Sequence, residues 1–344
     1  MNESRIGKRL LTLIQGESPT DATGRRGFLT AVTAGVMGAG ARILGAQQRS
    51  QARQPPAGDT LPYRPNWGRW GANDSKGAVN LITPEKIREA AGLVKTGRAV
   101  SLSRPYAPEQ QYVRINDRRA TTGASSIIDY YGSNYHGVNV THVDALSHVW
   151  DRAGMWNGRD PDKELDTFGP HFADIAAFSS GLITRGVLLD VPRYRQAPFV
   201  TVAEPVRGEE LEAIAKDQNV TIRPGDALLV YSGREAFARE AGAPYGPASA
   251  QRPGLHQSCA KFVRDTDVAV LCWDMHDAMP DPQGLAWPMH GVLYRYGVPL
   301  VDNALLEPLA KACLEEKRQE FMFVALPLNI PRGTGSPANP IALF

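Results

Sequence analysis

Short apolar runs alternate with amphipathic segments along the chain from residue 60 to residue 344. Apolar runs bounded by Gly, Pro and Asp are typical of buried strands, whereas apolar residues spaced three and four apart predict helices. We expect strands at 99–102, 187–191, 227–231, 268–273 and 321–326, and helices at 209–217, 255–264 and 304–318. No internal repeat interrupts this alternation, which predicts one α/β domain.

A further helix is predicted to begin after Thr83. Thr83 supplies an N-cap, Pro84 suits the first turn, and Glu85 places an acid near the helix N-terminus. Apolar residues then follow with helical spacing until Gly97 ends the segment. The strand expected at 99–102 comes directly afterwards.

The first 53 residues differ in character from the rest. Arg25 and Arg26 stand directly before a Gly- and Ala-rich apolar stretch at 28–41, and a polar linker follows at 47–56. This order resembles a twin-arginine export signal, so we predict a signal and linker at 1–53, a folded domain at 54–344, and a periplasmic or secreted protein. The apolar stretch is shorter than the ~20 residues of a spanning helix, which predicts no stable membrane span. The alternative is a cytoplasmic protein with a chance pair of arginines.

Composition and charge narrow the classes of function. The 344 residues are 42% hydrophobic and 22% charged, as in ordinary globular proteins. The formal net charge is +2, but residues 1–53 hold eight basic and three acidic residues, so the remainder is slightly acidic. Nucleic-acid binding needs a basic surface to neutralise phosphates, and we exclude it. The three cysteines include no CxxC pair, so they indicate neither a disulfide framework nor a cysteine zinc site.

Histidines gather between residues 136 and 148. In an extended strand residues i and i+2 share a face, so His142 and Asp144 are expected to point into one cavity. If the chain then turns into a helix, His148 returns to the same place. Imidazole and carboxylate groups together make half a metal site. The alternative for a lone histidine is a hydrogen-bonded core or surface residue, but the spacing of this group favours a metal site.

Two separated patterns resemble one known family. Residues 141–148, THVDALSH, reproduce the THxDxxxH half of the signature HxGTHxDxPxH, and residues 290–303, HGVLYRYGVPLVDN, fit the element HxxLLxxGxxIxEN. Both belong to the cyclase-like metal-dependent hydrolases, the family that includes bacterial kynurenine formamidase and isatin hydrolase. The resemblance covers nearly all of 54–344. It implies a single domain with the swivelling β/β/α fold, in which helices surround a mixed sheet.

The chain departs from the family signature at several positions. The first His of the signature is Val138 here, and the proline is Leu146. His136, two residues before Val138, would replace the missing ligand only if the backbone brought it closer. Asp302 stands where the second element has Glu, and its shorter side chain favours monodentate binding or a shifted ion.

Carried over to this sequence, the resemblance implies that His142, Asp144, His290 and Asp302 bind one or two Zn²⁺ or Mn²⁺ ions. Asp144 and Asp302 are the residues able to bridge two ions. His148 is implied as the proton donor and acceptor, or as a ligand in a one-metal site. This division agrees with elementary chemistry, because a bound cation activates water and a nearby imidazole transfers protons at neutral pH.

Aromatic residues near these motifs are candidates for substrate binding. Trp67 and Trp70 precede the main run of elements, and Trp156 and Asn157 follow the histidine motif, so all four are expected to line the pocket. Core packing is the alternative for each. His276 follows a predicted strand end, where site residues are common, but the role of a polar loop residue fits it equally well.

The resemblance implies hydrolysis of a carbon–nitrogen amide bond, as in arylformamidases that act on N-formylkynurenine. Patterns required for other hydrolases are missing, among them HExxH and GxSxG. One alternative is a hydrolase or cyclase for cyclic amides or lactones. A second alternative is a non-catalytic periplasmic metal-binding protein, which the presence of His148 argues against. The resemblance also implies a homo-oligomer.

The arginine pair generates a first prediction. Replacing Arg25 and Arg26 together with Lys keeps the charge but removes the paired guanidinium groups, so the precursor should stay in the cytoplasm. Cell fractionation followed by immunoblotting measures this. Periplasmic delivery at the parent level would show that the arginines do not direct export.

Overall fold

The structure is a computed structural model that describes residues 61–242, 244–246 and 251–344. The predicted signal and linker at 1–53 lies outside the described residues, so export stays a prediction. Within the described part of the chain, no helix is both long and apolar enough to cross a membrane.

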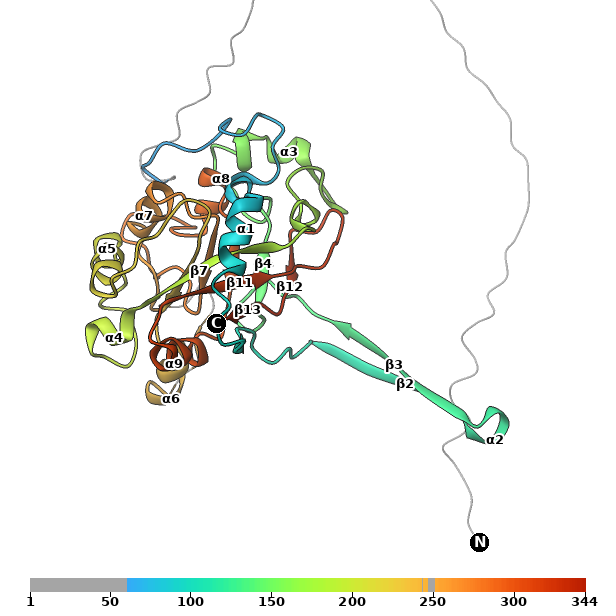
Figure 1. Cartoon of the computed structure of the whole chain (residues 1–344). Helices are drawn as coiled ribbons and strands as arrows, with labels where there is room; N and C mark the ends of the chain where they lie inside the picture. Colours follow the sequence, from blue (N-terminus) through green and yellow to red (C-terminus); the bar gives the residue numbers. More distant parts are fainter. Residues whose placement is uncertain (1–60, 243, 247–250) are drawn as a thin grey trace, which may run out of the picture. The chain divides into compact units, whose positions relative to one another are not determined.

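A mixed sheet forms the centre of the fold (Figure 1). Among the described residues it has nine strands, in the order β1-β13-β11-β7-β8-β9-β10-β4-β12. Strands β7, β8, β9 and β10 run parallel to one another, and antiparallel strands extend the sheet on both sides. The strands are β1 (Ala99–Ser101), β4 (His142–Asp144), β7 (Leu182–Asp190), β8 (Ala227–Tyr231), β9 (Val270–Trp273), β10 (Leu300–Asp302), β11 (Glu320–Ala325), β12 (Gly335–Pro337) and β13 (Ile341–Leu343).

Helices and short turns surround this sheet. They are α1 (Pro84–Ala91), α2 (Arg119–Thr122), α3 (Pro161–Glu164), α4 (Val191–Arg195), α5 (Gly208–Asp217), α6 (Arg234–Glu240), α7 (Cys259–Asp265), α8 (Val292–Tyr296), α9 (Glu307–Glu316) and the 3₁₀ turns η1 (Gly77–Leu81), η2 (Trp156–Gly158) and η3 (Ile175–Phe178). Helix α1 packs on β7 and β11, and α9 packs on β1 and β7. The predicted fold class, an α/β single domain with a mixed sheet, is confirmed.

Most predicted elements are present, and their chemistry explains their bounds. Strands β8 and β9 are buried along their whole length, as expected for parallel strands covered on both faces. Helix α1 begins after Thr83, whose side chain accepts a hydrogen bond from the Lys86 backbone N–H at 3.3 Å.

Two predicted helices are too long. The helix expected at 255–264 begins only at Cys259, because Leu255 forms isolated bridges with Val206 and Asp277 and its N–H donates to the His276 carbonyl. The helix expected at 304–318 covers only α9. The N–H of Ala304 donates to the Trp273 carbonyl instead, which keeps this end of the segment extended.

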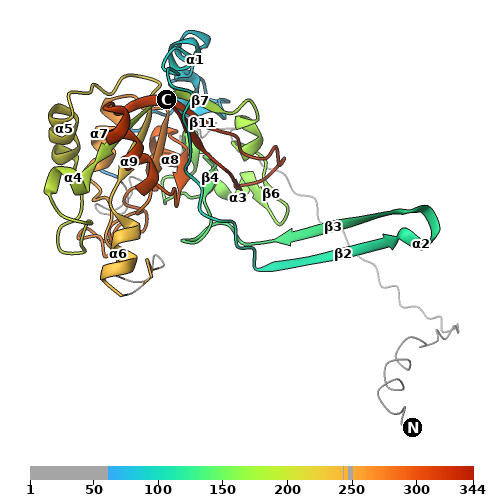
Figure 2. The same cartoon turned by 60° about the horizontal axis from the view of Figure 1, so that its bottom comes forward.

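Two further pairs of strands lie outside the main sheet. β2 (Gln110–Arg118) and β3 (Ala124–Gly132) form a long hairpin, and β5 (Leu165–Asp166) pairs with β6 (Gly169–Pro170). Figure 2 shows the β2–β3 hairpin extending from the body of the domain. Its strands pair only with each other among the described residues.

A buried ion cluster ties the sheet to α1. Arg185 on β7 is 2% exposed and bonds to Asp226 and Glu320, while Lys86 Nζ lies 2.5 Å from Asp226 Oδ1. Removing the cationic partner of a buried carboxylate lowers the free energy of unfolding far more than removing that of an exposed one, because water does not solvate the buried charge. The cluster therefore contributes to stability only while all its members are present.

This cluster predicts an asymmetry between two arginines. Arg185→Met leaves Asp226 and Glu320 without their guanidinium partner, and should lower the free energy of unfolding by about 3 kcal/mol. Arg88→Met, which removes an exposed partner of Glu85, is the matched control and should leave stability unchanged. Chemical denaturation of the two variants measures the difference. Equal losses of unfolding free energy in the two variants would show that the buried cluster contributes no more to stability than the exposed ion pair.

Candidate metal centre

Strand β4 places two predicted ligands on one face of the sheet. It lies between β10 and β12, and His142 is directly opposite Asp302 in the antiparallel ladder with β10. Opposite residues of an antiparallel pair share a face, and so do residues two apart on one strand. His142, Asp144 and Asp302 therefore meet on the same side, as the extended segment predicted.

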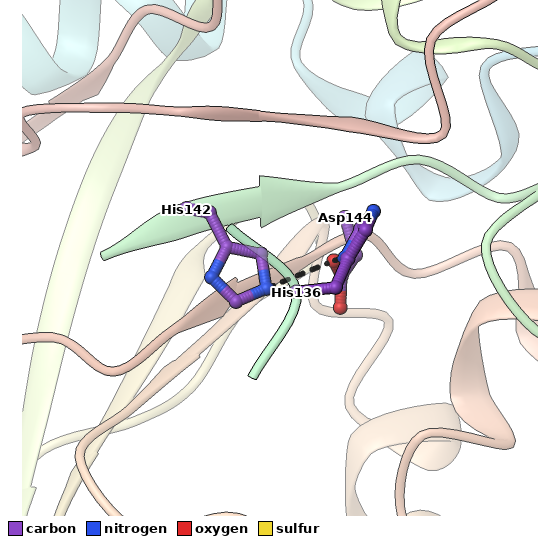
Figure 3. Close-up of side chains that lie close together, drawn as sticks. All are labelled: His136, His142 and Asp144. Carbon is purple, nitrogen blue, oxygen red and sulfur yellow. Dashed lines mark ion pairs between the residues drawn. The ribbon is translucent and has the colours of Figure 1, made fainter. Parts of the chain in front are cut away.

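The first group of possible ligands is His136, His142 and Asp144 (Figure 3). Asp144 Oδ1 lies 3.0 Å from His136 Nδ1 and 3.2 Å from His142 Nε2. His136 reaches this place because residues 136–140 form a series of bends rather than a strand. The backbone thus brings His136 to the ligands, while half-buried Val138 packs against the core.

The second group consists of His276, His290 and Asp302, all buried. Asp302 Oδ2 lies 3.1 Å from His290 Nε2 and 3.4 Å from His276 Nε2. His276 follows β9 and Asp302 ends β10, so both come from the carboxyl ends of adjacent parallel strands. The sequence left two roles open for His276, that of a site residue and that of a polar loop residue. The structure places it among the candidate ligands.

The two groups adjoin each other. His290 Nε2 of the second group lies 4.0 Å from Asp144 Oδ2 of the first. Asp144 therefore faces ligands of both groups. An arrangement of two three-residue groups sharing a boundary carboxylate has the form of a two-ion site.

Hydrogen bonds fix which nitrogen of each ring faces the centre. His142 Nδ1 donates to the Val140 carbonyl at 2.8 Å, and His290 Nδ1 bonds to Asp277. Both rings therefore present Nε2 to the carboxylates. Asp277 is itself held by the backbone N–H groups of Met289 and His290. Partners of this kind, which orient an imidazole from behind, are characteristic of metal-binding histidines.

Unsatisfied polar atoms converge on the same place. His136 Nδ1, both carboxylate oxygens of Asp144 and His276 Nε2 are buried and have no hydrogen-bond partner within the described chain. Buried polar groups without partners are costly, and cations held by the two groups would satisfy these atoms. The donor set of imidazole nitrogen and carboxylate oxygen fits Zn²⁺ or Mn²⁺ and does not distinguish them.

His148 lies beside the first group, but not by the route expected. The residues after Asp144 form a turn, closed by the His148 N–H donating to the Ala145 carbonyl at 3.0 Å, and not the helix by which His148 could have returned to the ligands. The His148 ring stacks on the His136 ring, with centroids 3.7 Å apart and planes at 5°. The turn thus brings His148 against a ligand without making it a member of either group.

Burial and close charges act against each other in this site. Burial lowers the pKa of His142, but the charge and hydrogen bond of Asp144, the charge of Asp302 and the hydrogen bond to Val140 together outweigh it and raise the pKa to about 9. For His148 burial dominates and lowers the pKa to about 4, against the attraction of Asp144. Burial raises the pKa of Asp144, yet the surrounding histidines hold it well below its usual range. Asp144 is therefore ionised, the form that binds a cation.

The aromatic residues expected around the substrate occupy a different place. Trp156 is fully buried, and its indole N–H donates to the Asp74 carbonyl at 2.8 Å, so it packs in the core, the alternative that the sequence had left open for it. Trp70 packs 6.2 Å from it, ring centroid to ring centroid. Trp67 donates to the Tyr294 carbonyl at 2.6 Å, and Asn157 bonds to the backbone of residues 68–74. Through these contacts the four residues link the segment 67–74 to η2 and to Tyr294.

Other aromatic rings lie at the ligands. Trp273 donates its indole N–H to Asp302, and the Trp287 ring lies 5.5 Å from that of His290. The half-buried Tyr135 ring is 4.5 Å from that of His136. The sequence held a signal for one of them, because Trp273 ends the strand predicted at 268–273 and lies three residues before His276. Nothing in the sequence pattern pointed to Trp287.

A buried set of histidines and aspartates, held on a mixed α/β sheet and converging on unsatisfied atoms, defines a metal-binding centre of the kind found in hydrolytic enzymes. The profile of the family described as "Putative cyclase" matches residues 100–278, and the chain belongs to this family of cyclase-like metal-dependent hydrolases.

The chain is also similar to solved structures. The crystal structure of a novel cyclase is 27% identical, with a TM-score of 0.72 over 82% of this chain and all of that one. Isatin hydrolase A from Labrenzia aggregata is 18% identical, with a TM-score of 0.48 over 74% of this chain and 94% of its own. Isatin hydrolase A from Ralstonia solanacearum is 17% identical, with a TM-score of 0.48 over 71% and 91%. No curated protein matches the chain.

The two groups predict the metal stoichiometry. Metal-free protein titrated with Zn²⁺ or Mn²⁺ should bind two ions, and His276→Ala should bind one, because only the second group loses a ligand. His171→Ala, at an exposed histidine outside both groups, is the control and should bind two. Elemental analysis after gel filtration measures the content. Two ions retained by His276→Ala would remove His276 from the ligand set.

Proposed function

We propose that this protein is a metal-dependent hydrolase that cleaves the carbon–nitrogen bond of an arylformamide of the N-formylkynurenine type. The observation that carries the proposal is the stacking of His148 on the candidate ligand His136. A second imidazole at that place is of no use to a site that only stores an ion, but it suits proton transfer during hydrolysis. This argues against the alternative of a non-catalytic metal-binding protein.

The candidate ligands would hold one or two Zn²⁺ or Mn²⁺ ions. His136, His142 and Asp144 form one place, and His276, His290 and Asp302 form the other. When bound, such an ion lowers the pKa of water and polarises the carbonyl oxygen of a substrate. Asp144, between the two groups, is the residue placed to serve both.

The protein's own residues supply the proton transfers and the orientation. His148 takes the proton from the attacking water and returns it to the leaving nitrogen, so the amine departs neutral. The ring stack with His136 holds His148 in position. Asp277 fixes the ring of His290, and Trp273 fixes the carboxylate of Asp302, so neither ligand needs to reorganise.

Aromatic side chains support an aromatic substrate. Tyr135 lies beside the first group and Trp287 beside the second, and both are half-buried rather than enclosed in the core. Flat rings at the edge of a polar centre favour a planar substrate through stacking and burial of apolar surface. An aryl group carrying a formamide meets this requirement.

A second candidate is the hydrolysis or closure of a cyclic amide or lactone. The 27% identical structure of a cyclase favours it. The same residues would serve, since opening a ring also needs an activated water and a proton donor for the leaving atom. A panel of arylformamides, lactams and lactones, assayed with Zn²⁺ or Mn²⁺, distinguishes the two candidates.

His148→Ala tests the proposal. The variant should keep its metal content and fold but lose turnover by about 10²- to 10⁴-fold, the usual contribution of a positioned acid and base. Metal content and rate should be measured on the same sample, with His171→Ala as the unchanged control.

Two results would contradict this role. Loss of metal and rate in parallel would make His148 a ligand. No turnover of any panel member by the metal-loaded parent protein would favour the non-catalytic alternative.

A further inference from the structure

Residues 252–255, which precede α7, lie against the loop that follows β9, and we call them the clasp. All four are buried. Arg252 and Met279 exchange backbone hydrogen bonds at 3.1 and 3.0 Å, and the N–H of Leu255 donates to the His276 carbonyl at 2.9 Å. The clasp therefore pairs with this loop at two points, one of which is the backbone of the candidate ligand His276.

The clasp is anchored on its other side as well. Val206, just before α5, donates its N–H to the Gly254 carbonyl at 3.0 Å and accepts the His256 N–H at 2.8 Å. Gly254 lies so close to the loop that a methyl group in place of its hydrogen would overlap the His276 carbonyl. The clasp is thus fixed within the domain and can hold the loop in place.

The Arg252 side chain reaches from the clasp to the residue behind His290. Its Nε donates to the Asp277 carbonyl at 2.9 Å, and its Nη2 donates to Asp277 Oδ2 at 3.2 Å. Arg252 is 3% exposed and Asp277 is 1% exposed. The same oxygen, Asp277 Oδ2, bonds to His290 Nδ1, while His290 Nε2 faces Asp302 at 3.1 Å. A planar guanidinium that holds both the backbone and the carboxylate of Asp277 therefore sets the orientation of the His290 ring.

Tyr245 supports the other histidine of the second group. Its buried hydroxyl accepts the His276 N–H at 2.7 Å and donates to the carbonyl of Pro253, in the clasp, at 3.1 Å. The Tyr245 ring also packs edge-on against the His276 ring, with centroids 5.9 Å apart and planes at 81°. Both histidines of the second group, His276 and His290, are therefore connected to the clasp.

The first group is held by other parts of the chain. The Thr334 hydroxyl lies 3.0 Å from His136 Nε2, and His142 Nδ1 donates to the Val140 carbonyl. Within the residues that the structure describes, no hydrogen bond or ion pair joins the clasp to His136, His142 or Asp144. The two groups thus adjoin each other but have separate supports.

We propose that Arg252 is a positioning residue for the second metal ion. It holds the ligand histidines of the second group in place and so sets the affinity of that ion, while the first ion binds independently of it. Removing a group that orients a metal-binding imidazole lowers metal affinity by about 10- to 100-fold. The inference rests on the two-ion site of the proposed function, but not on its substrate.

Calorimetric titration of metal-free protein with Zn²⁺, in the presence of a competing chelator, tests this role. The parent should bind two ions in two steps, and the step that His276→Ala abolishes belongs to the second group. Arg252→Lys keeps the charge but cannot make both bonds to Asp277, so it should weaken that step by about 10- to 100-fold and leave the other unchanged. Arg195→Lys, which alters a similar guanidinium contact with Glu210 outside both groups, is the matched control and should bind both ions as the parent does.

Tyr245→Phe tests the clasp without disturbing the ion pair of Arg252 and Asp277. The variant loses one hydroxyl that bonds to the His276 backbone, and it leaves no buried charge unpaired. It should weaken the same Zn²⁺ step by about fivefold, the effect of one net hydrogen bond. Circular dichroism verifies that each variant is folded.

Three results would overturn the proposal. Equal weakening of both steps by Arg252→Lys would show a general loss of stability, and parent affinity in both steps would show that His290 needs no support from Arg252. A single Zn²⁺ step in the parent would remove the second ion altogether. Turnover is not measured here, so the proposed function can fail with the substrate panel while this inference holds, and the inference can fail while the hydrolase remains active.

Discussion

The register of β4 between β10 and β12 is the constraint on which the site depends. Because His142 is opposite Asp302, the ladder itself sets the spacing between the two candidate ligand groups. A slip by one residue would turn His142 and Asp144 to the other face. Asn303 opposes such a slip, since its side-chain amide donates to the Gly137 and Val140 carbonyls just before β4.

A buried polar network holds Asn303 in place and so supports that register. Arg234 donates to the side-chain oxygen of Asn303 at 2.6 Å, and its backbone N–H donates to Asp274. Asp274 also receives the N–H groups of Ser232 and Gly233 at the end of β8. Buried polar groups thus fix the loop around Asn303, at a place where an apolar core would be more stable. Such an exchange of stability for geometry is typical of functional sites, and a bound cation offsets part of its cost.

The fold was predictable where the local sequence pattern was clear. The strand expected at 227–231, an unbroken apolar run, has the same bounds in the structure, and the helix expected at 209–217 differs from α5 by one residue. The start of α7 was missed because Leu255 pairs with residues distant in sequence. The β2–β3 hairpin was not predicted either. Its apolar residues fall on both faces, so its pattern is neither a helix nor a half-buried strand.

Spacing alone predicted that His142 and Asp144 share a face, since a strand places alternate residues on one side whatever surrounds it. His290 and Asp302 became candidate ligands through the resemblance to the family's second motif. The bends at 136–140 decided that His136 stands among the ligands despite Val138, and the adjacency of β9 and β10 decided the same for His276. Trp156 was assigned to the substrate by its nearness in sequence, yet packing put it in the core. Local pattern fixes which way a side chain points within its own element. Only the pairing of distant segments determines which other side chains it meets.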